Sequence, residues 1–209
     1  MEIQHQDLSY EIYRELKRMI LTNEIEPKTK LKQEQIAKMF GVSRMPLHRA
    51  FQMLENEMLI ESIPRRGFFV TEINKTILYD SFECRMALEG IAVKRAAKNI
   101  TDKELKYLKS LFEEFIEVDE ISVSKYTDSD QKFHHKIMEI SGNLILNKLE
   151  LLGNNTIRTF RGGLLRSPNE TLPEHFAIIA ALENRNGELA EELVREHTQK
   201  SMDTLKNIT

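Results

Sequence analysis

The feature that most constrains this chain is a pair of short helical patterns between Gln33 and Leu54, QEQIAKMFGVSRMPLHRAFQML. The first pattern ends at Gly41, and glycine supplies the backbone freedom that a tight turn between helices requires. The second opens at Ser43, whose hydroxyl is expected to accept from the free amides of the first turn. Pro46 falls in that turn, where a missing N–H costs little. The sequence therefore predicts a helix-turn-helix.

The second of these helices has two chemically different faces. Successive side chains advance by about 100°, so apolar and polar residues separate into opposite arcs. The apolar arc, which we expect in the core, consists of Leu47, Ala50, Phe51, Leu54 and Met58. The opposite arc consists of Arg44, Met45, His48, Arg49 and Gln52. Such a face suits a recognition helix in the major groove of DNA. A solvated face of an ordinary amphipathic helix has the same pattern.

The flanking segments favour DNA binding. An apolar helical stripe from Leu8 to Ile20 precedes the pair, and short strands are expected at Leu59–Ser62 and Phe68–Thr71. The turn between the strands, Ile63–Gly67, carries two arginines at its tip. Between Pro27 and Val70 there are eight Lys/Arg against four Asp/Glu, although the whole chain has a net charge of −3. This layout predicts a winged helix with its positive charge where phosphates would lie.

Composition sets the broad class of the protein. The 209 residues, 41% hydrophobic and 30% charged, fit one large or two modest soluble domains. No apolar run approaches the ~20 residues of a membrane span, and the amino terminus has no secretory signal. The single cysteine, Cys84, allows no internal disulfide, and we expect it to pack against another helix. These features predict a cytoplasmic protein.

The fold class expected from the whole chain is mainly α. We expect a winged helix-turn-helix domain over residues 1–70, a linker over 71–76 and an all-helical, six-helix bundle over 77–209. The six predicted helices are Lys75–Lys98, Thr101–Asp119, Ser122–Ser141, Leu144–Gly162, Pro168–Asn184 and Gly187–Lys206. From Thr71 onward there are 19 Lys/Arg against 23 Asp/Glu, so this half is not expected to follow nucleic acid.

Three histidines and one aspartate of the second half are expected to face inward. Asp130 and His134 are four residues apart and share a helix face. His175 and His197 each lie within the apolar arc of a later helix. A buried imidazole left unpaired costs about 1–3 kcal/mol, so each ring alone could simply be a core residue bonded to a backbone carbonyl. Together the four side chains suit Zn²⁺, Ni²⁺, Mn²⁺ or Fe²⁺.

Arginines are the candidate ligand-binding residues. Arg85 falls within an apolar stripe of the first long helix, where an arginine is costly unless paired. It would either form an i,i+4 pair with Glu89 or clamp the carboxylate of a ligand, since a guanidinium matches a carboxylate bidentately. Arg158 and Arg161 are weaker candidates of the same kind.

Residues Tyr10–Val70 resemble the DNA-binding domain of the GntR family of bacterial transcription regulators. The resemblance is carried by YEIYRELKRMIL, by GVSRMPLHRAFQMLENEMLI and by PRRGFFV. It implies that a cap hydroxyl, the arginine after it and the wing contact DNA. Met45 and His48 depart from the usual threonine and arginine, which leaves the operator sequence open. The expected DNA-contacting residues are Lys32, Glu34, Ser43, Arg44, Met45, His48, Arg49, Arg65, Arg66 and Gly67.

The second half resembles the FCD effector domain, the commonest partner of this DNA-binding domain. The matching motifs are SDQKFH at Ser129–His134, ISGN at Ile140–Asn143 and PEH at Pro173–His175. Six helices match the shorter, vanillate-type subgroup. The resemblance implies that Asp130 and the three histidines hold a divalent metal. It also implies an arginine at the place of Arg85 and a small organic acid as ligand.

These observations lead to one hypothesis and two alternatives. We expect a homodimeric transcription regulator, a repressor, whose affinity for operator DNA changes when a carboxylate metabolite binds near the metal. The first alternative is a metal-dependent enzyme, although neither an HExxH motif nor a clearly placed general base is present. The second is a regulator whose metal is purely structural.

Overall fold

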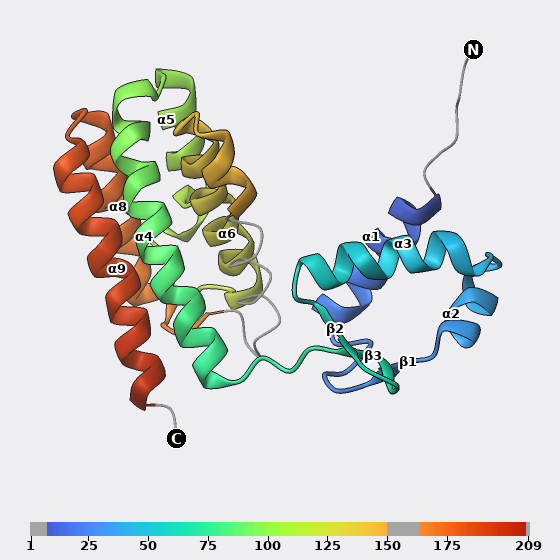
Figure 1. The fold of residues 1–209 in the computed structure, drawn as a ribbon. Helices are drawn as coiled ribbons and strands as arrows, with labels where there is room; N and C mark the ends of the chain where they lie inside the picture. Colours follow the sequence, from blue (N-terminus) through green and yellow to red (C-terminus); the bar gives the residue numbers. More distant parts are fainter. Residues whose placement is uncertain (1–7, 150–163, 208–209) are drawn as a thin grey trace, which may run out of the picture. The chain divides into compact units, whose positions relative to one another are not determined.

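The computed structural model describes residues 8–149 and 164–207 (Figure 1). The chain divides into two compact units, the first ending at Asn74 and the second beginning at Lys75. The first unit combines helices with a small sheet, and every regular element of the second unit within the described residues is a helix. The expected fold class, mainly α with a winged helix-turn-helix followed by a helical bundle, is confirmed.

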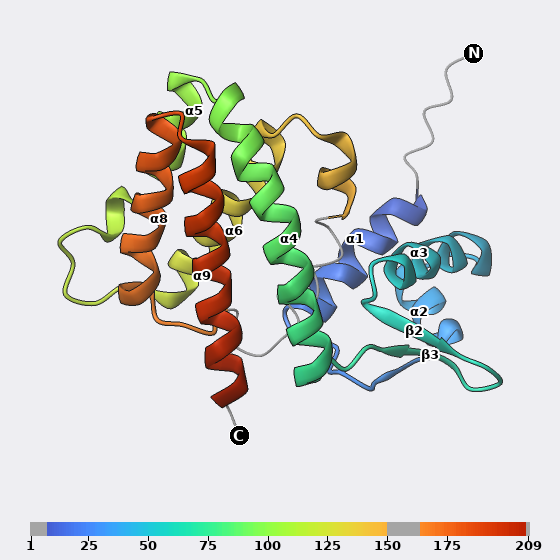
Figure 2. The ribbon, with the colours of Figure 1, turned by 60° about the vertical axis from the view of Figure 1, so that its left-hand side comes forward.

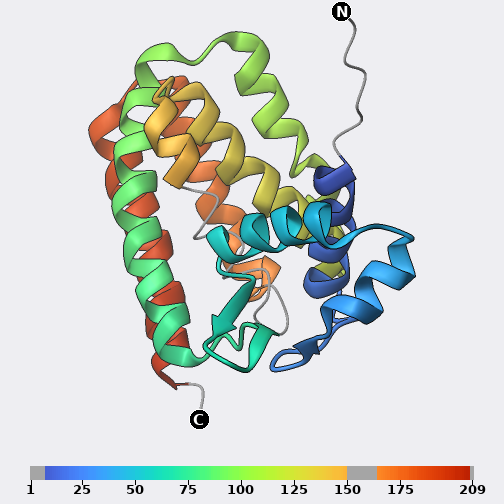
Figure 3. The ribbon, with the colours of Figure 1, turned by 45° about the vertical axis from the view of Figure 1, so that its right-hand side comes forward.

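Within the described residues, the first unit has three helices and a three-stranded antiparallel sheet. Figure 3 shows this unit in blue to teal. Its elements are α1 (Leu8–Leu21), β1 (Lys30–Leu31), α2 (Gln33–Phe40), α3 (Arg44–Asn56), β2 (Ile60–Ile63) and β3 (Gly67–Val70). The strand order is β1-β3-β2, with Ile60 opposite Val70 and Ile63 opposite Gly67. The two expected strands are present, and β1 is a third strand that the sequence analysis missed because it is only two residues long.

The turn between α2 and α3 agrees with the sequence prediction at Gly41 but not at Ser43. Gly41 ends α2 in the left-handed conformation, with φ 64°, and its amide donates to the carbonyls of Ala37 and Lys38. Ser43 is extended at the N-cap of α3, but its hydroxyl makes no capping bond, contrary to expectation. Met58 was also wrongly placed in the core. It lies two residues beyond the end of α3, has φ 57° and is 47% exposed.

The core of this unit is the expected apolar face of α3 packed on α1. Leu16 of α1 and Phe51 and Leu54 of α3 are fully buried. The ring of Phe68, at the start of the wing strand β3, meets Phe51 edge-on at 4.9 Å between centroids. Burying one side of α3 in this way leaves its polar side turned outward, which is the requirement for a recognition helix.

The second unit is a helical bundle. Its elements are α4 (Lys75–Asn99), α5 (Asp102–Ser110), the 3₁₀ turn η1 (Glu113–Phe115), α6 (Val123–Ile140), α8 (Pro168–Glu183) and α9 (Gly187–Asn207). Helices α4 and α9 lie side by side, as Figures 1 and 2 show, while α8 packs on α9 and α6 on α4. Among the described residues, no helix is both long enough and apolar enough to span a bilayer.

Two expectations for this unit need correction, and a third lies largely outside the described residues. The helix expected over Thr101–Asp119 ends at Ser110, and the chain tightens into η1, which lets Phe112 and Phe115 both enter the core. The helix expected over Leu144–Gly162 is described only as far as residue 149, and the rest lies outside the described residues. Cys84 is exposed on α4 rather than packed.

Candidate metal centre and nucleic-acid interface

The face of α3 that was predicted to read DNA is turned to solvent. Helix α3 buries Leu47 and Ala50, and the arc on the other side is open. All ten residues expected to contact DNA are exposed, namely Lys32, Glu34, Ser43, Arg44, Met45, His48, Arg49, Arg65, Arg66 and Gly67. This exposure leaves their side chains available to a partner.

Arg44 at the start of α3 is held by an acid of α2. Its Nη2 atom donates to Oε1 of Glu34 at 2.7 Å, and both side chains are largely exposed. Exposed ion pairs of this kind contribute at most about 1 kcal/mol, so a phosphate can displace the carboxylate. Because Ser43 provides no capping bond, the amides at this helix start also suit an anion.

The wing places two cations over one aromatic ring. The guanidinium carbon of Arg66 lies 5.2 Å from the centroid of Phe69, and Nζ of Lys30 lies 5.9 Å from it. Gly67 has φ +94° at the tip, where a side chain would be strained. Lys30 was missed as a site residue because β1, which carries it to the wing strand, was not predicted.

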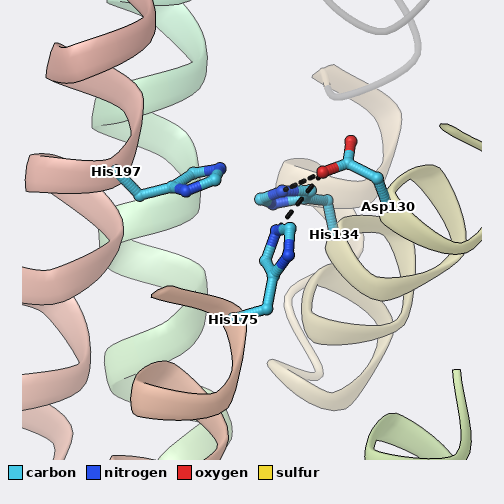
Figure 4. A group of neighbouring side chains, drawn as sticks. All are labelled: Asp130, His134, His175 and His197. Atoms are coloured by element: carbon cyan, nitrogen blue, oxygen red, sulfur yellow. Dashed lines mark ion pairs between the residues drawn. The ribbon is translucent and has the colours of Figure 1, made fainter. Parts of the chain in front are cut away.

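The second unit brings the predicted aspartate and three histidines together (Figure 4). Asp130 and His134 come from α6, His175 from α8 and His197 from α9. One ligand atom from each lies within 4.8 Å of the others, and the four residues are only 0–8% exposed. They were expected to face inward, and each does.

Distances and unsatisfied atoms test whether a metal suits this cluster. Two ligands on opposite sides of a metal with ~2.1 Å bonds are about 4.2 Å apart, so the widest separation allowed by the 4.8 Å limit would need to shorten by about 0.6 Å. Oδ1 of Asp130 lies 3.7 Å from Nε2 of His134 and 3.3 Å from Nε2 of His175. Both Nε2 atoms are buried without a hydrogen-bond partner. Three nitrogens and one carboxylate oxygen with these distances fit a divalent cation.

The protonation states also favour a cation. Burial lowers the pKa of His175 to about 4, and burial likewise lowers the pKa of His197. Burial opposes the imidazolium of His134 too, but the carboxylates of Glu89 and Asp130 outweigh it and raise its pKa. Burial would raise the pKa of Asp130, yet its interactions with the nearby rings of His134 and His175 hold that pKa well below the usual range. The ionised aspartate and the neutral rings of His175 and His197 are in the forms that metals require, whereas His134, whose pKa is raised, would release a proton on binding a metal.

Three further residues contact the Nδ1 atoms of the histidines, and the sequence analysis did not assign them to the site. Nδ1 of His197 lies 2.7 Å from Oε2 of Glu174, and Nδ1 of His175 lies 3.0 Å from the hydroxyl of Tyr126. Nδ1 of His134 lies 2.9 Å from Oε2 of Glu89. This oxygen has no well-aligned donor in the structure, so a small rotation of the His134 ring would complete the bond. A glutamate buried among apolar residues of α4 was the available signal for Glu89.

Arg85 forms the intrahelical pair that was one of its two predicted roles. Its Nε atom donates to Oε1 of Glu89 at 2.6 Å, and its side chain is only 12% exposed. Arg85 is therefore linked through Glu89 to His134. Arg158 and Arg161, the weaker ligand-binding candidates, lie outside the described residues.

A small cavity reaches the side of the cluster formed by His197. It has a volume of about 270 Å³, lies between α8 and α9, and is lined by residues that include Glu174, His197 and Lys200. Ligand pockets for drug-sized molecules are about 300–1,000 Å³, so this cavity suits a smaller solute.

Comparison with known proteins agrees with both halves of the structure. The family model "Bacterial regulatory proteins, gntR family" matches residues 8–70, and the FCD domain model matches residues 80–200. The chain is 28% identical over 207 residues to the HTH-type transcriptional repressor RspR of Escherichia coli K12, covering 97% of this chain and 91% of RspR. It is also 28% identical over 190 residues to the Nta operon transcriptional regulator of Aminobacter aminovorans, covering 91% and 90%.

Solved structures show the same fold. E. coli McbR/YncC superposes with a TM-score of 0.73 at 20% identity, covering 96% of this chain and 97% of that one. A GntR transcriptional regulator from Rhodococcus sp. RHA1 superposes with a TM-score of 0.76 at 19% identity, covering 96% and 98%. The family and these relatives are transcription regulators, so the enzyme alternative is set aside. The chain belongs to the GntR family of bacterial regulatory proteins, with an FCD domain as its second half.

Proposed function

We propose that this protein is a homodimeric repressor that binds operator DNA and is controlled by a small organic acid bound beside a divalent metal. The main support for this proposal is a cluster of four side chains in the FCD half of the chain, namely Asp130, His134, His175 and His197. The other half of the chain exposes the basic face of α3. In this proposal residues 1–70 are the DNA-binding domain, 71–76 the linker, and 77–209 the effector and dimerisation domain.

The DNA-binding half of the proposal rests on α3 and the wing. Arg44 and its neighbours on the exposed arc would enter the major groove, while Arg65, Arg66 and Gly67 would meet the minor groove and its phosphates. Met45 can contact a thymine methyl but offers a base no hydrogen bond. Two copies of the chain would present two recognition helices to the half-sites of a palindrome.

The sensing half rests on the cluster and on Arg85. Four protein ligands leave positions on a six-coordinate metal for water or for a small anionic ligand. A carboxylate that engages Arg85 would compete with Glu89, whose other oxygen faces the ligand His134. Binding of such an acid would therefore change the packing of α4 against α6.

The covalent path to the DNA-binding unit is short. Helix α4, which carries Arg85 and Glu89, begins at Lys75, five residues after Val70 ends the wing strand β3. A change in the packing of α4 would shift the end of the wing directly. Coupling between effector and operator sites is typically about 1–3 kcal/mol, which corresponds to a 5–150-fold change in operator affinity.

The test is fluorescence anisotropy on DNA from the promoter of the protein's own operon. Metal-loaded wild-type protein should bind specifically, and one member of a panel of di-, tri- and aromatic carboxylic acids should change its affinity 5–150-fold. Asp130→Asn should retain DNA binding and lose the response to the acid. Arg44→Ala should weaken specific binding by about 1–3 kcal/mol.

Two results would contradict the proposal in different ways. Weak binding that ignores sequence, unaltered in Arg44→Ala, would contradict the DNA-binding half. A metal that stabilises the protein while no acid in the panel alters DNA affinity would leave the metal purely structural and would contradict the sensing half.

A further inference from the structure

In each histidine of the cluster, one ring nitrogen points toward the centre of the cluster. The other ring nitrogen lies close to an acceptor on a separate residue. The Nδ1 atoms of His134, His175 and His197 lie 2.9, 3.0 and 2.7 Å from Glu89, Tyr126 and Glu174, in that order. The three partners come from α4, α6 and α8. In a neutral imidazole only one nitrogen carries the proton, so the partner of Nδ1 decides whether Nε2 is free to bind a metal.

The two carboxylates can only accept. Oε1 of Glu89 accepts from Nε of Arg85 at 2.6 Å, and Glu174 accepts from Arg166 and Lys200. A carboxylate paired with a cation in this way is ionised. An ionised carboxylate has no proton to donate. In the neutral rings, Nδ1 of His134 and of His197 therefore carries the proton, and Nε2 faces the centre as a lone pair.

Tyr126 also places the proton of its histidine on Nδ1, through hydrogen bonds between hydroxyl groups. Thr171 Oγ1 donates to the carbonyl of Ser167 at 3.3 Å, which uses its proton. The Tyr126 hydroxyl, 2.9 Å away, then donates to Thr171 Oγ1 and accepts from Nδ1–H of His175. Nε2 of His175 then carries a lone pair that lies beside the carboxylate of Asp130. A cation between them would remove the repulsion between the lone pair and the carboxylate.

Each glutamate is itself held by cations on its far side. Arg85 donates to Glu89 at 2.6 Å. Arg166 donates to both oxygens of Glu174, at 2.7 and 2.8 Å, and Lys200 donates to Oε1 at 3.1 Å. These cations fix which carboxylate oxygen faces the imidazole. They also offset two negative charges close to a site that already contains Asp130.

We propose that Glu89, Tyr126 and Glu174 are positioning residues that hold all three imidazoles with the proton on Nδ1 and so reserve the three Nε2 atoms for a divalent metal. The inference rests on the metal centre of the proposed function. It adds that the selection of the ligand atoms is already made in the metal-free protein.

Glu89→Gln provides the sharpest test because its outcome is set by Arg85. Arginine only donates, so the amide oxygen of the glutamine must face Arg85. The amide NH₂ would then face Nδ1 of His134 and donate to it. The proton of His134 would move to Nε2, where it points at the centre and blocks a metal. Glu83→Gln, an exposed change on the same helix, is the matched control.

The first measurement reads the tautomers by ¹H–¹⁵N NMR of the full-length, metal-free protein labelled at histidine, at an alkaline pH that keeps the rings neutral. Wild type and Glu83→Gln should show Nδ1–H for His134, His175 and His197. Glu89→Gln should switch His134 alone to Nε2–H, and Tyr126→Phe should switch His175 alone. Nε2–H at His134 in wild type, or an unchanged tautomer in Glu89→Gln, would overturn the inference.

The second measurement is competition for Zn²⁺ with a chromophoric chelator. Loss of a residue that orients a ligand typically costs 10–100-fold in metal affinity, and this loss is expected for Glu89→Gln and Tyr126→Phe but not for Glu83→Gln. Equal affinities in all four proteins would overturn the inference. Wild-type protein that binds neither Zn²⁺, Ni²⁺, Mn²⁺ nor Fe²⁺ would contradict the proposed metal centre, while the NMR result would still decide the tautomers. Should either variant fail to fold, the wild-type tautomers decide.

Discussion

The ring of Phe112 lies stacked on the imidazole of His175, with centroids 4.5 Å apart and planes 10° from parallel. Phe112 follows the end of α5 and is fully buried. A residue of the segment that follows α5 is thus packed against a candidate metal ligand. Because the phenyl ring fixes one face and Tyr126 fixes the edge, the position of His175 is determined before any metal binds.

Removing that ring should destabilise the effector unit. Phe112→Ala is expected to lower the free energy of unfolding by about 3–5 kcal/mol, the usual cost of deleting a buried phenylalanine. Urea unfolding followed by circular dichroism measures it. The control is Ile116→Ala, four residues on and 46% exposed, which should stay within about 0.5 kcal/mol of wild type. A loss below 1 kcal/mol for Phe112→Ala would contradict the packing described.

The two N-caps of α5 and α6 should respond differently to alanine. Thr101 Oγ1 accepts from the amide of Glu104 at 3.3 Å, and Glu104 Oε2 accepts from the amide of Thr101 at 3.0 Å. Ser122 at the start of α6 makes no such side-chain bond. Thr101→Ala should therefore cost about 1 kcal/mol and Ser122→Ala much less. Thermal unfolding of the two variants compares them, and equal losses would contradict this assignment.

The metal-free protein should lose stability in mild acid because of His175. Its pKa falls from 6.5 to about 4 on folding, so the unfolded chain binds the extra proton between those values. Stability from this group is complete above about pH 6.5 and declines as the pH falls toward 4, by roughly 3 kcal/mol. His134, whose pKa is raised, contributes in the opposite direction. Subtracting the profile of His175→Asn from that of wild type isolates His175, and a flat difference between pH 6.5 and 4 would contradict the prediction.

Chelation should destabilise the loaded protein. A metal that binds only the folded state adds about 4 kcal/mol when its free concentration is a thousand times its Kd. Scanning calorimetry of Zn²⁺-loaded protein with and without EDTA should show a lower melting temperature after chelation. In Asp130→Asn the two curves should coincide. A Zn²⁺ effect of equal size in wild type and Asp130→Asn would place the metal elsewhere.

Replacing two arginines of the DNA-binding unit with alanine should change DNA binding in different ways. Arg44→Ala should cost about 1–3 kcal/mol on the specific operator, because it removes a contact from the recognition helix. Arg66→Ala should weaken binding to all sequences and reduce the slope of log affinity against log salt by about 1. Anisotropy titrations at several salt concentrations separate the two, with Lys98→Ala on the effector unit as control. The same loss of specificity in both variants would contradict these roles.

Local patterns were sufficient for much of the fold and for the candidate ligands. The 3.6-residue period placed Leu47, Ala50, Phe51 and Leu54 on the buried face of α3, because a helix surface repeats with its own geometry. The same period predicted that His175 and His197 point inward. The spacing of four residues put Asp130 and His134 on one face, and both are buried.

Patterns failed where a distant contact decided the outcome. The helical period continued past Ser110, but the burial of Phe112 and Phe115 ended the helix there. We expected Cys84 to pack against another helix, yet among the described residues it is exposed. The strand β1 exists only because it pairs with β3, and two residues have no period of their own.

Glu89 shows the same division within one residue. Its pairing with Arg85 was predictable from four residues of separation, since helix geometry alone brings such side chains together. Its approach to His134, 45 positions later in the chain, depends on the packing of α4 against α6. Short-range spacing was therefore enough to predict most of the helices, the faces they bury and the four side chains suited to a metal. Which atoms of those side chains meet, and which residues hold them, depends on how the helices pack, because nothing in local spacing sets the distance between helices.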